Sequence, residues 1–234
     1  MTKRRKFALL CLEGDRSYEK AHDLWVNQRA FHIIEVFMHY LPRIDLDGSS
    51  KLTIFFKPVK ENERQYMKNE FQGVSWYYVD EAEIDRYRTL KKEEEEEYYL
   101  NIIVDTLKTI AQIDGRPKEI SDIIDKTAQT VRECGFELTL HIKKLSKTSA
   151  DGQYRANVYR HISRLGESWY VEIKDKDKNI TRHGIDLLKK PTFISQTGVF
   201  VLARWEGGRF VVTDRFGKVT AEVGAGQYSL HKGE

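Results

Sequence analysis

The sequence predicts an α+β protein with a helix-rich α/β lobe over residues 1–135 and an antiparallel, β-rich lobe over residues 136–234. Apolar residues recur at helical spacing through much of the first part and alternate with polar residues through most of the second. The charge also changes near Gly135, because residues 136–234 contain 17 basic and 11 acidic residues, against 22 and 25 in the remainder. No linker rich in Gly, Ser or Pro marks this change, so a single domain with a shared core is the alternative.

The elements of the first lobe follow from apolar spacing and from turn residues. Strands are expected in three segments, residues 6–12, 51–59 and 74–79. Helices are expected from the turn at residues 14–17 to Leu41, from about Asp80 to Ile110, and from Ile120 to Cys134. Pro42 ends the first helix, because the residue before a proline is pushed out of the α region. Gly135 suits the left-handed cap of the last helix.

The second lobe consists of strands joined by turns. Alternation predicts strands at residues 138–142, 154–162, 169–173, 199–205, 209–213 and 218–223. Asp151-Gly152 and Gly207-Gly208 are hairpin signals between neighbouring strands. We therefore expect at least the final three strands to form an antiparallel meander.

Composition and cysteine content limit the class of protein. Hydrophobic residues make up 40% and charged residues 32% of the chain, as in soluble globular proteins. No apolar run approaches the ~18–20 residues that cross a bilayer, and Phe7–Leu12 is shorter than the ~7–15 residues of a signal-peptide core. Cys11 and Cys134 are too few for a disulfide framework, so we expect free thiols in a reducing compartment. The expected location is the cytoplasm, with no membrane contact.

The sharpest enzymatic candidate is the trio Asp151, Glu172 and Lys174. Residues i and i+2 of a strand project to the same face, so Glu172 and Lys174 stand side by side, and a hairpin can bring Asp151 near them. Two carboxylates can hold a divalent metal that activates water, with the lysine near the developing charge. The pattern resembles the D…ExK core of metal-dependent nucleases, and this resemblance implies a divalent metal as cofactor. The alternative is a solvated strand face with a cross-strand ion pair.

A second candidate is a metal site at His32, Glu35 and His39. The offsets i, i+3 and i+7 lie on one face of a helix. That face is directed away from the apolar stripe around Ile33 and Phe37, so we expect it to be exposed. Histidine and carboxylate ligands suit zinc or iron. The alternative is a polar helix face in which Glu35 contacts His39.

Two further features concern anions and acidic surfaces. Ligands of α/β folds often bind after the carboxyl ends of strands, but Glu13 and Asp15 make the first of these turns acidic, so helix capping is its expected role. The run Glu93–Glu97 forms either a solvated helix face or an acidic patch for a basic partner.

The basic lobe interleaves cations with aromatic residues, as do proteins that bind phosphates with cations and stack bases on exposed rings. By strand alternation, Arg155, Tyr159 and His161 share one face. The candidate nucleic-acid-binding residues are Lys143, Lys144, Arg155, Tyr159, Arg160, Arg164, Arg204, Arg209 and Arg215.

The sequence contains neither a nucleophilic triad nor a cofactor fingerprint. We therefore expect a soluble, intracellular, non-enzymatic interaction protein of an immunity-type, antitoxin-like or accessory assembly kind, which needs no cofactor and binds a protein partner. The alternative is a nucleic-acid-binding protein that uses the basic lobe. Metal-dependent nuclease activity extends this alternative if Asp151, Glu172 and Lys174 converge. The sequence indicates no oligomeric state.

Overall fold

The computed structural model describes residues 6–22, 25–60, 62–186 and 195–225. The chain divides into two units, Met1–Glu137 and Leu138–Glu234, which we call the N-terminal and the C-terminal unit. The N-terminal unit combines helices with a mainly parallel sheet. The described part of the C-terminal unit contains antiparallel strands and no helix. The α+β class with a β-rich C-terminal part is therefore confirmed. The sequence-based boundary follows residue 135.

A four-stranded sheet forms the centre of the N-terminal unit. Strands β1 (Leu9–Gly14), β2 (Lys51–Phe56) and β4 (Val74–Tyr78) run parallel, and β3 (Tyr66–Asn69) pairs with β4 in the antiparallel sense. The resulting order is β1-β2-β4-β3. Strand β3 is missing from the sequence-based expectation because all four of its residues are half-buried, so it lacks the alternation that marks a strand.

The described part of this unit contains the helices α1 (Arg16–His22), α2 (Val26–Arg29), α3 (Phe31–Tyr40), α4 (Glu81–Thr89), α5 (Glu95–Ile113) and α6 (Pro117–Glu133). The continuous helix expected up to Leu41 is wrong, although residues 23–24 of that segment lie outside the described residues. Trp25 has an extended backbone, and the Val26 amide donates to the Glu19 carboxylate at 2.8 Å, a bond that a continuous helix would make to a backbone carbonyl.

The continuous helix expected from Asp80 to Ile110 is also wrong, and Arg29 explains why. Leu90 has an extended backbone between α4 and α5. The Arg29 guanidinium donates to the Leu90 carbonyl oxygen at 3.2 Å and pairs with Glu95 at 2.7 Å. Because the last carbonyls of a helix need partners from outside the helix, a tertiary contact that local spacing does not reveal stabilises the break.

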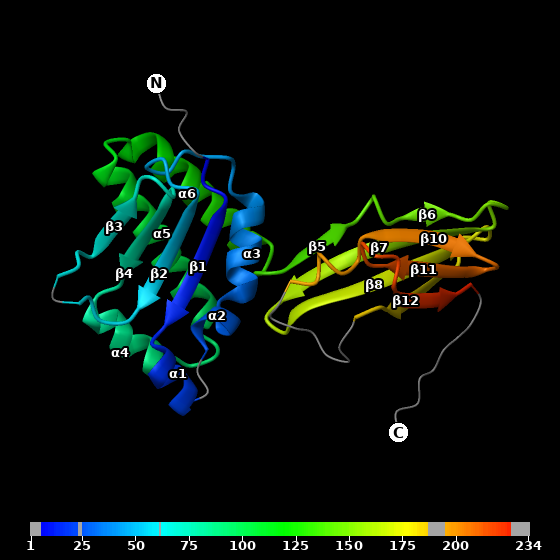
Figure 1. Ribbon diagram of the computed structural model, residues 1–234, viewed down its shortest axis with the longest axis horizontal. Helices are drawn as coiled ribbons and strands as arrows, with labels where there is room; N and C mark the ends of the chain where they lie inside the picture. Colours follow the sequence, from blue (N-terminus) through cyan, green and yellow to red (C-terminus); the bar gives the residue numbers. More distant parts are fainter. Residues whose placement is uncertain (1–5, 23–24, 61, 187–194, 226–234) are drawn as a thin grey trace. The chain divides into compact units, whose positions relative to one another are not determined.

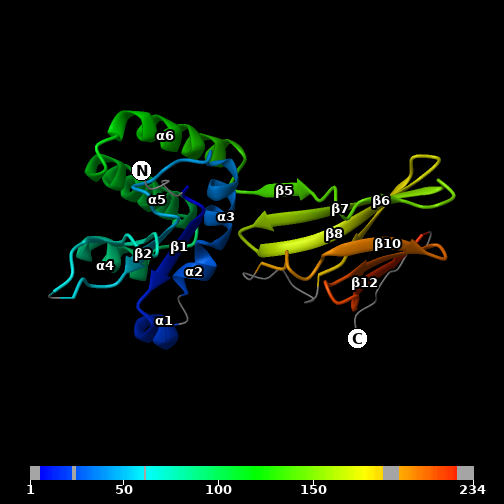
Figure 2. The same ribbon diagram turned by 45° about the horizontal axis from the view of Figure 1, so that its top comes forward.

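The helices cover one face of the sheet. Leu10, Leu12, Leu52, Ile54 and Phe56 are almost completely buried and alternate along β1 and β2, so their side chains share this face. Figures 1 and 2 show α4, α5 and α6 on that side of the sheet. The opposite face, nearest the viewer in Figure 1, carries no helix within the described part of the chain.

The C-terminal unit is a sandwich of two antiparallel sheets (Figure 1). The first sheet contains β5 (Leu138–His141), β7 (Tyr154–Ser163), β8 (Gly166–Asp175) and β9 (Ile180–Gly184) in that order, with β6 (Lys147–Thr148) also paired to β7. The second sheet contains β10 (Leu202–Glu206), β11 (Arg209–Thr213) and β12 (Val219–Gly224), so the expected meander of the final three strands is confirmed.

The core of the sandwich lies between these two sheets. Val158 and Trp169 from the first sheet are buried in one cluster with Phe210 and Val212 from the second and with Phe200. This arrangement leaves one face of each sheet directed away from the core. None of the helices in the described residues of the chain combines the length and the apolar character that crossing a membrane requires.

Candidate functional site

The outer face of the β5-β7-β8-β9 sheet gathers polar and aromatic side chains. Ala156, Val158 and Ile162 of β7 are buried, so the alternate residues of this strand point away from the core. Strand β8 alternates in the same way. The resulting surface, which we call the basic–aromatic face, contains His141, Arg155, Asn157, Tyr159, His161, Ser168, Tyr170, Glu172, Lys174 and Arg182.

A row of aromatic rings crosses three strands of this face, β5, β7 and β8, and Arg182 of β9 continues it. Tyr159 lies directly opposite Tyr170, with ring centroids 5.1 Å apart, and the His141 ring lies 5.2 Å from Tyr159 on the other side. The Arg182 guanidinium covers the far side of the Tyr170 ring at 4.4 Å. Ring faces inside the row are therefore occupied, so the row offers ring edges and hydroxyl groups, and His141 is its exposed end. Burial raises the pKa of Tyr170, which keeps its phenol neutral.

Two cations lie directly opposite each other on the same face, separated from the Tyr159–Tyr170 pair of this row by the Asn157–Glu172 pair, about 13 Å along the strands. Arg155 of β7 is the cross-strand partner of Lys174 of β8. Like charges in this position destabilise a sheet. Within the described residues neither cation forms an ion pair, and Arg155 Nε donates to the neutral Asn157 side chain at 3.2 Å. The pair is thus arranged to attract an anion.

The structure gives Asp151 and Glu172 of the Asp151, Glu172 and Lys174 trio separate partners. Glu172 and Lys174 share the outer face of β8, and Glu172 pairs with Arg182 of β9 at 2.6 Å, a cross-strand ion pair. Asp151 lies in the turn before β7, where it accepts hydrogen bonds from the Ser149 hydroxyl at 2.6 Å and the Gln153 amide at 3.0 Å. These bonds lower the pKa of the Asp151 carboxyl.

Strand register places Glu172 away from Asp151, whereas Lys174, the partner of Arg155, lies near the end of β7 at which the Asp151 turn begins. Tyr154, the first residue of β7, pairs with Asp175, whereas Glu172 pairs with Asn157. About 10 Å of strand therefore separates Glu172 from the end at which the Asp151 turn begins. No group of three or more metal-ligating side chains occurs within the residues that the structure describes.

The second metal candidate lies on α3. His32 is only 1% exposed, and its Nε2 lies 3.1 Å from Glu96 Oε1 of α5. The expectation that this helix face is exposed is therefore wrong for His32, because α5 packs against it. The His39 ring contacts the neighbouring Tyr40 ring, with centroids 5.0 Å apart, and Glu35 is half-buried.

Arg160 faces the interior of the sandwich, on the side of β7 opposite Arg155. It is 7% exposed, and its Nε donates to Glu167 at 2.8 Å. Glu167 is completely buried and also accepts from Trp169 Nε1 at 2.6 Å and the Gln196 amide at 2.7 Å. The sequence alone could have placed Arg160 in the interior, because Arg160 lies in the same alternating series as the buried Ala156, Val158 and Ile162.

The remaining cations of the basic lobe are dispersed. Arg204 pairs with Glu206 at 2.5 Å, and Arg209 pairs with Glu222 at 2.8 Å, both on the second sheet. Other candidates lie in turns: Lys143 and Lys144 follow β5, Arg164 joins β7 to β8, and Arg215 lies over the Phe216 ring after β11. Arg155 and Tyr159 are the candidates that the structure places together on the outer face, beside Lys174.

Side chains of the protein itself occupy the space at the turn after β1. Asp15 Oδ1 accepts the Ser17 amide at 2.9 Å, as helix capping requires. Glu19 is 4% exposed, and its Cδ lies 2.7 Å from the position that a Cβ on Gly14 would take. A carboxylate therefore occupies the space beside the carboxyl end of β1.

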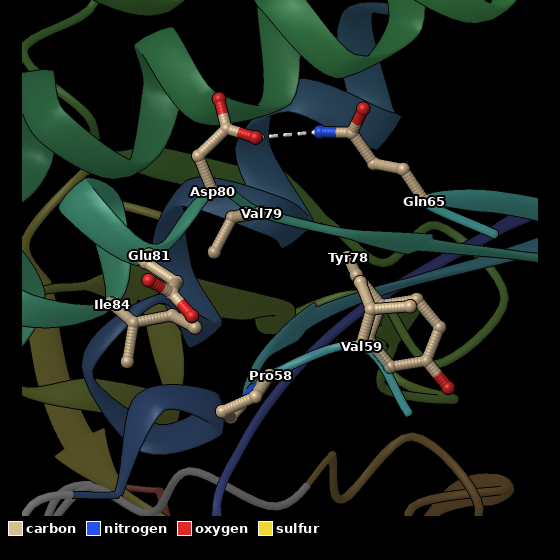
Figure 3. Close-up of a pocket in the computed structure, with 8 residues that line it drawn as sticks. All are labelled: Pro58, Val59, Gln65, Tyr78, Val79, Asp80, Glu81 and Ile84. Carbon is tan, nitrogen blue, oxygen red and sulfur yellow. Dashed lines mark hydrogen bonds between the residues drawn. The ribbon is translucent and has the colours of Figure 1, made fainter. Parts of the chain in front are cut away.

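A pocket that the sequence does not indicate lies at the carboxyl ends of β2 and β4. It has a volume of about 330 Å³, and Figure 3 shows its lining residues, Pro58, Val59, Gln65, Tyr78, Val79, Asp80, Glu81 and Ile84. This is the end of a parallel sheet at which α/β proteins bind ligands. The residues come from two segments, 58–65 and 78–84, which only strand pairing brings together.

In comparisons with known proteins, no protein family, no curated protein and no solved structure matches the chain.

Proposed function

We propose that the protein binds nucleic acid through the basic–aromatic face of its C-terminal unit. The observation that carries the proposal is the placement of Arg155 directly opposite Lys174, with no ion-pair partner in the described residues. A phosphate between the two cations would relieve a repulsion that the fold otherwise retains. The aromatic row on the same face, about 13 Å along the strands, favours an extended ligand such as a nucleic acid over a simple inorganic anion.

The geometry favours recognition of the backbone over recognition of sequence. Arg182 is already held by Glu172 and Tyr170, which leaves Arg155 and Lys174 as the phosphate contacts of the face. The inner ring faces of the row are covered, so a base can stack only on His141, while the tyrosine hydroxyls reach sugars and base edges. Two phosphate contacts on a single strand correspond to a salt slope of roughly −1.4 in log–log form.

The experiment is a fluorescence anisotropy titration of the full chain with a labelled, mixed-sequence single-stranded oligonucleotide over a salt series. We expect binding at low salt that weakens with added salt, and a loss of about tenfold or more in the double variant R155E/K174E. R215E/K218E is the matched control, since it reverses two exposed cations in a turn of the second sheet and changes the net charge by the same amount. Failure to bind at low salt, or equal affinity of the double variant, contradicts the proposal.

The proposal extends to the cytoplasm as the site of action and to binding without turnover. Cys11 and Cys134 are free thiols, which suits a reducing compartment. Glu172 holds Arg182, and Asp151 holds its own turn, so both carboxylates have structural partners. Oligonucleotide cleavage in Mg²⁺ that Glu172→Gln abolishes would show that the face is catalytic and would overturn this part of the proposal.

A further inference from the structure

The face of the N-terminal sheet opposite the helices exposes apolar side chains. In parallel neighbours, register partners share a face, so Leu9, Cys11, Phe55, Trp76 and Tyr78 all lie on the side away from Leu10 and Ile54. Leu9 is 49% exposed, and Cys11, Phe55 and Trp76 are half-buried. We call this surface the open face.

An uncovered face is unusual for a sheet of this kind. Parallel strands occur almost only in sheets that are covered on both faces, because both of their faces are apolar. Here β1, β2 and β4 are parallel, and the described helices lie on one side of them (Figures 1 and 2). Glu13 and Lys51 also lie on the open face by register, but its apolar part, Leu9, Phe55 and Trp76, is of the kind normally in contact with protein.

The pocket at the carboxyl ends of β2 and β4 adjoins the open face through Tyr78. This residue belongs to the open face by register with Phe55 and also lines the pocket. Figure 3 shows the Tyr78 ring on one side of the pocket and Glu81 and Ile84 on the other. The volume of about 330 Å³ lies at the lower end of the range of ligand pockets and is suited to one long side chain.

The charged groups that line the pocket are acidic, and they have no counter-ion among the residues that the structure describes. Asp80 stands at the N-cap position of α4 without making a capping hydrogen bond and instead accepts from Gln65 Nε2 at 2.8 Å (Figure 3). Glu81 is exposed beside it, and neither carboxylate forms an ion pair within the described residues. Burial, with the adjacent Glu63 carboxylate, raises the pKa of Tyr78 to about 12, so no phenolate competes for a cation.

We propose that the open face and its acidic pocket dock a partner protein through a segment in which an arginine or lysine is flanked by apolar residues. The basic side chain lays its methylene stem along Val59 and Ile84 and directs its charge to Asp80 and Glu81. The flanking apolar residues cover Trp76 and Leu9, whereas the Lys57 ammonium, 4.0 Å from the centre of the Phe55 ring, already covers Phe55. Acidic groups repel phosphate, so a nucleic acid is excluded from this surface. The inference is independent of the nucleic-acid proposal, which concerns the C-terminal unit.

The test is selection of a random seven-residue peptide display library on the immobilised full chain. We expect enriched peptides to combine one arginine or lysine with aromatic or aliphatic neighbours. Synthetic copies should bind the double variant D80N/E81Q about tenfold more weakly, the loss of roughly one charge-assisted contact. The matched control E93Q/E94Q removes two exposed carboxylates outside the pocket and should bind like the wild type.

Three outcomes overturn the proposal. The first is a selection that yields no enriched peptide or only peptides without a basic residue, and the second is equal binding by D80N/E81Q. The third is a dimer of the purified chain in analytical ultracentrifugation that Leu9→Glu abolishes, because this result would assign the open face to a second copy of the chain. Circular dichroism of each variant distinguishes lost binding from lost folding.

Discussion

In the described part of the chain, the basic–aromatic face of the C-terminal unit and the open face of the N-terminal unit both lack a covering layer, and the two faces differ in chemistry. In the antiparallel sheet of the C-terminal unit, alternation places polar residues outside and apolar residues inside, so an open outer face is ordinary. In the parallel sheet of the N-terminal unit, Phe55 and Trp76 stand on the open side. An uncovered face is therefore ordinary for the antiparallel sheet and unusual for the parallel sheet, so the exposure of a face must be interpreted together with the type of sheet. On the first face the unusual feature is a pair of unneutralised cations, and on the second it is the exposure itself.

The largest expected effect is a loss of stability, and it appears when a buried ion pair of the C-terminal unit is compared with an ion pair on its outer face. Glu167→Ala removes the completely buried carboxylate that accepts hydrogen bonds from Arg160, Trp169 Nε1 and the Gln196 amide, so we expect a loss of about 3–5 kcal/mol of unfolding free energy. Glu172→Ala removes the half-buried carboxylate that pairs with the exposed Arg182 and should cost less than about 1 kcal/mol. Urea unfolding followed by tryptophan fluorescence measures both. Similar losses in the two variants would contradict the assignment of Arg160 to the interior.

Alternation along β7 and β8 allowed the outer residues of the basic–aromatic face to be predicted from sequence, because a period of two fixes which residues share a face. It placed Arg155, Tyr159 and His161 together. The same alternation assigns Arg160 to the interior, yet its charge favoured a surface position until the structure revealed the buried Glu167 as its partner.

Features that depend on contacts between distant segments could not be predicted in this way. The break between α4 and α5 depends on Arg29, which lies 66 residues before Glu95. The pocket joins segments 58–65 and 78–84 through strand pairing. Which face of the N-terminal sheet stays open depends on the side against which the helices pack. The sequence does not indicate this side, because the short strands of this unit carry apolar residues on both faces.

A second, smaller effect compares glycines in the two units. Gly14→Ala places a methyl group against the buried Glu19 carboxylate. The carboxylate must then move away from the Val26 amide, whose hydrogen bond it accepts at 2.8 Å. We expect a loss of about 1–3 kcal/mol, as for other overpacked sites. Gly184→Ala is the matched control, because no atom lies within 4 Å of its added Cβ. The midpoints of urea unfolding compare the two, and a Gly14→Ala midpoint at or above that of Gly184→Ala would refute the close packing after β1.

The smallest effect is the most specific, because it links stability to binding on the basic–aromatic face. Lys174→Glu converts a like-charged cross-strand pair with Arg155 into an opposite-charged one, so the folded protein should gain about 0.2–1 kcal/mol. The same change should weaken oligonucleotide binding, since it removes one phosphate contact and adds repulsion. Lys143→Glu, in the exposed turn after β5, is the control and should leave stability within about 0.5 kcal/mol of the wild type. A purely structural face would change stability without changing affinity. A gain in stability together with a loss of affinity would instead mean that the Arg155–Lys174 repulsion is retained in the fold for the sake of an anionic ligand.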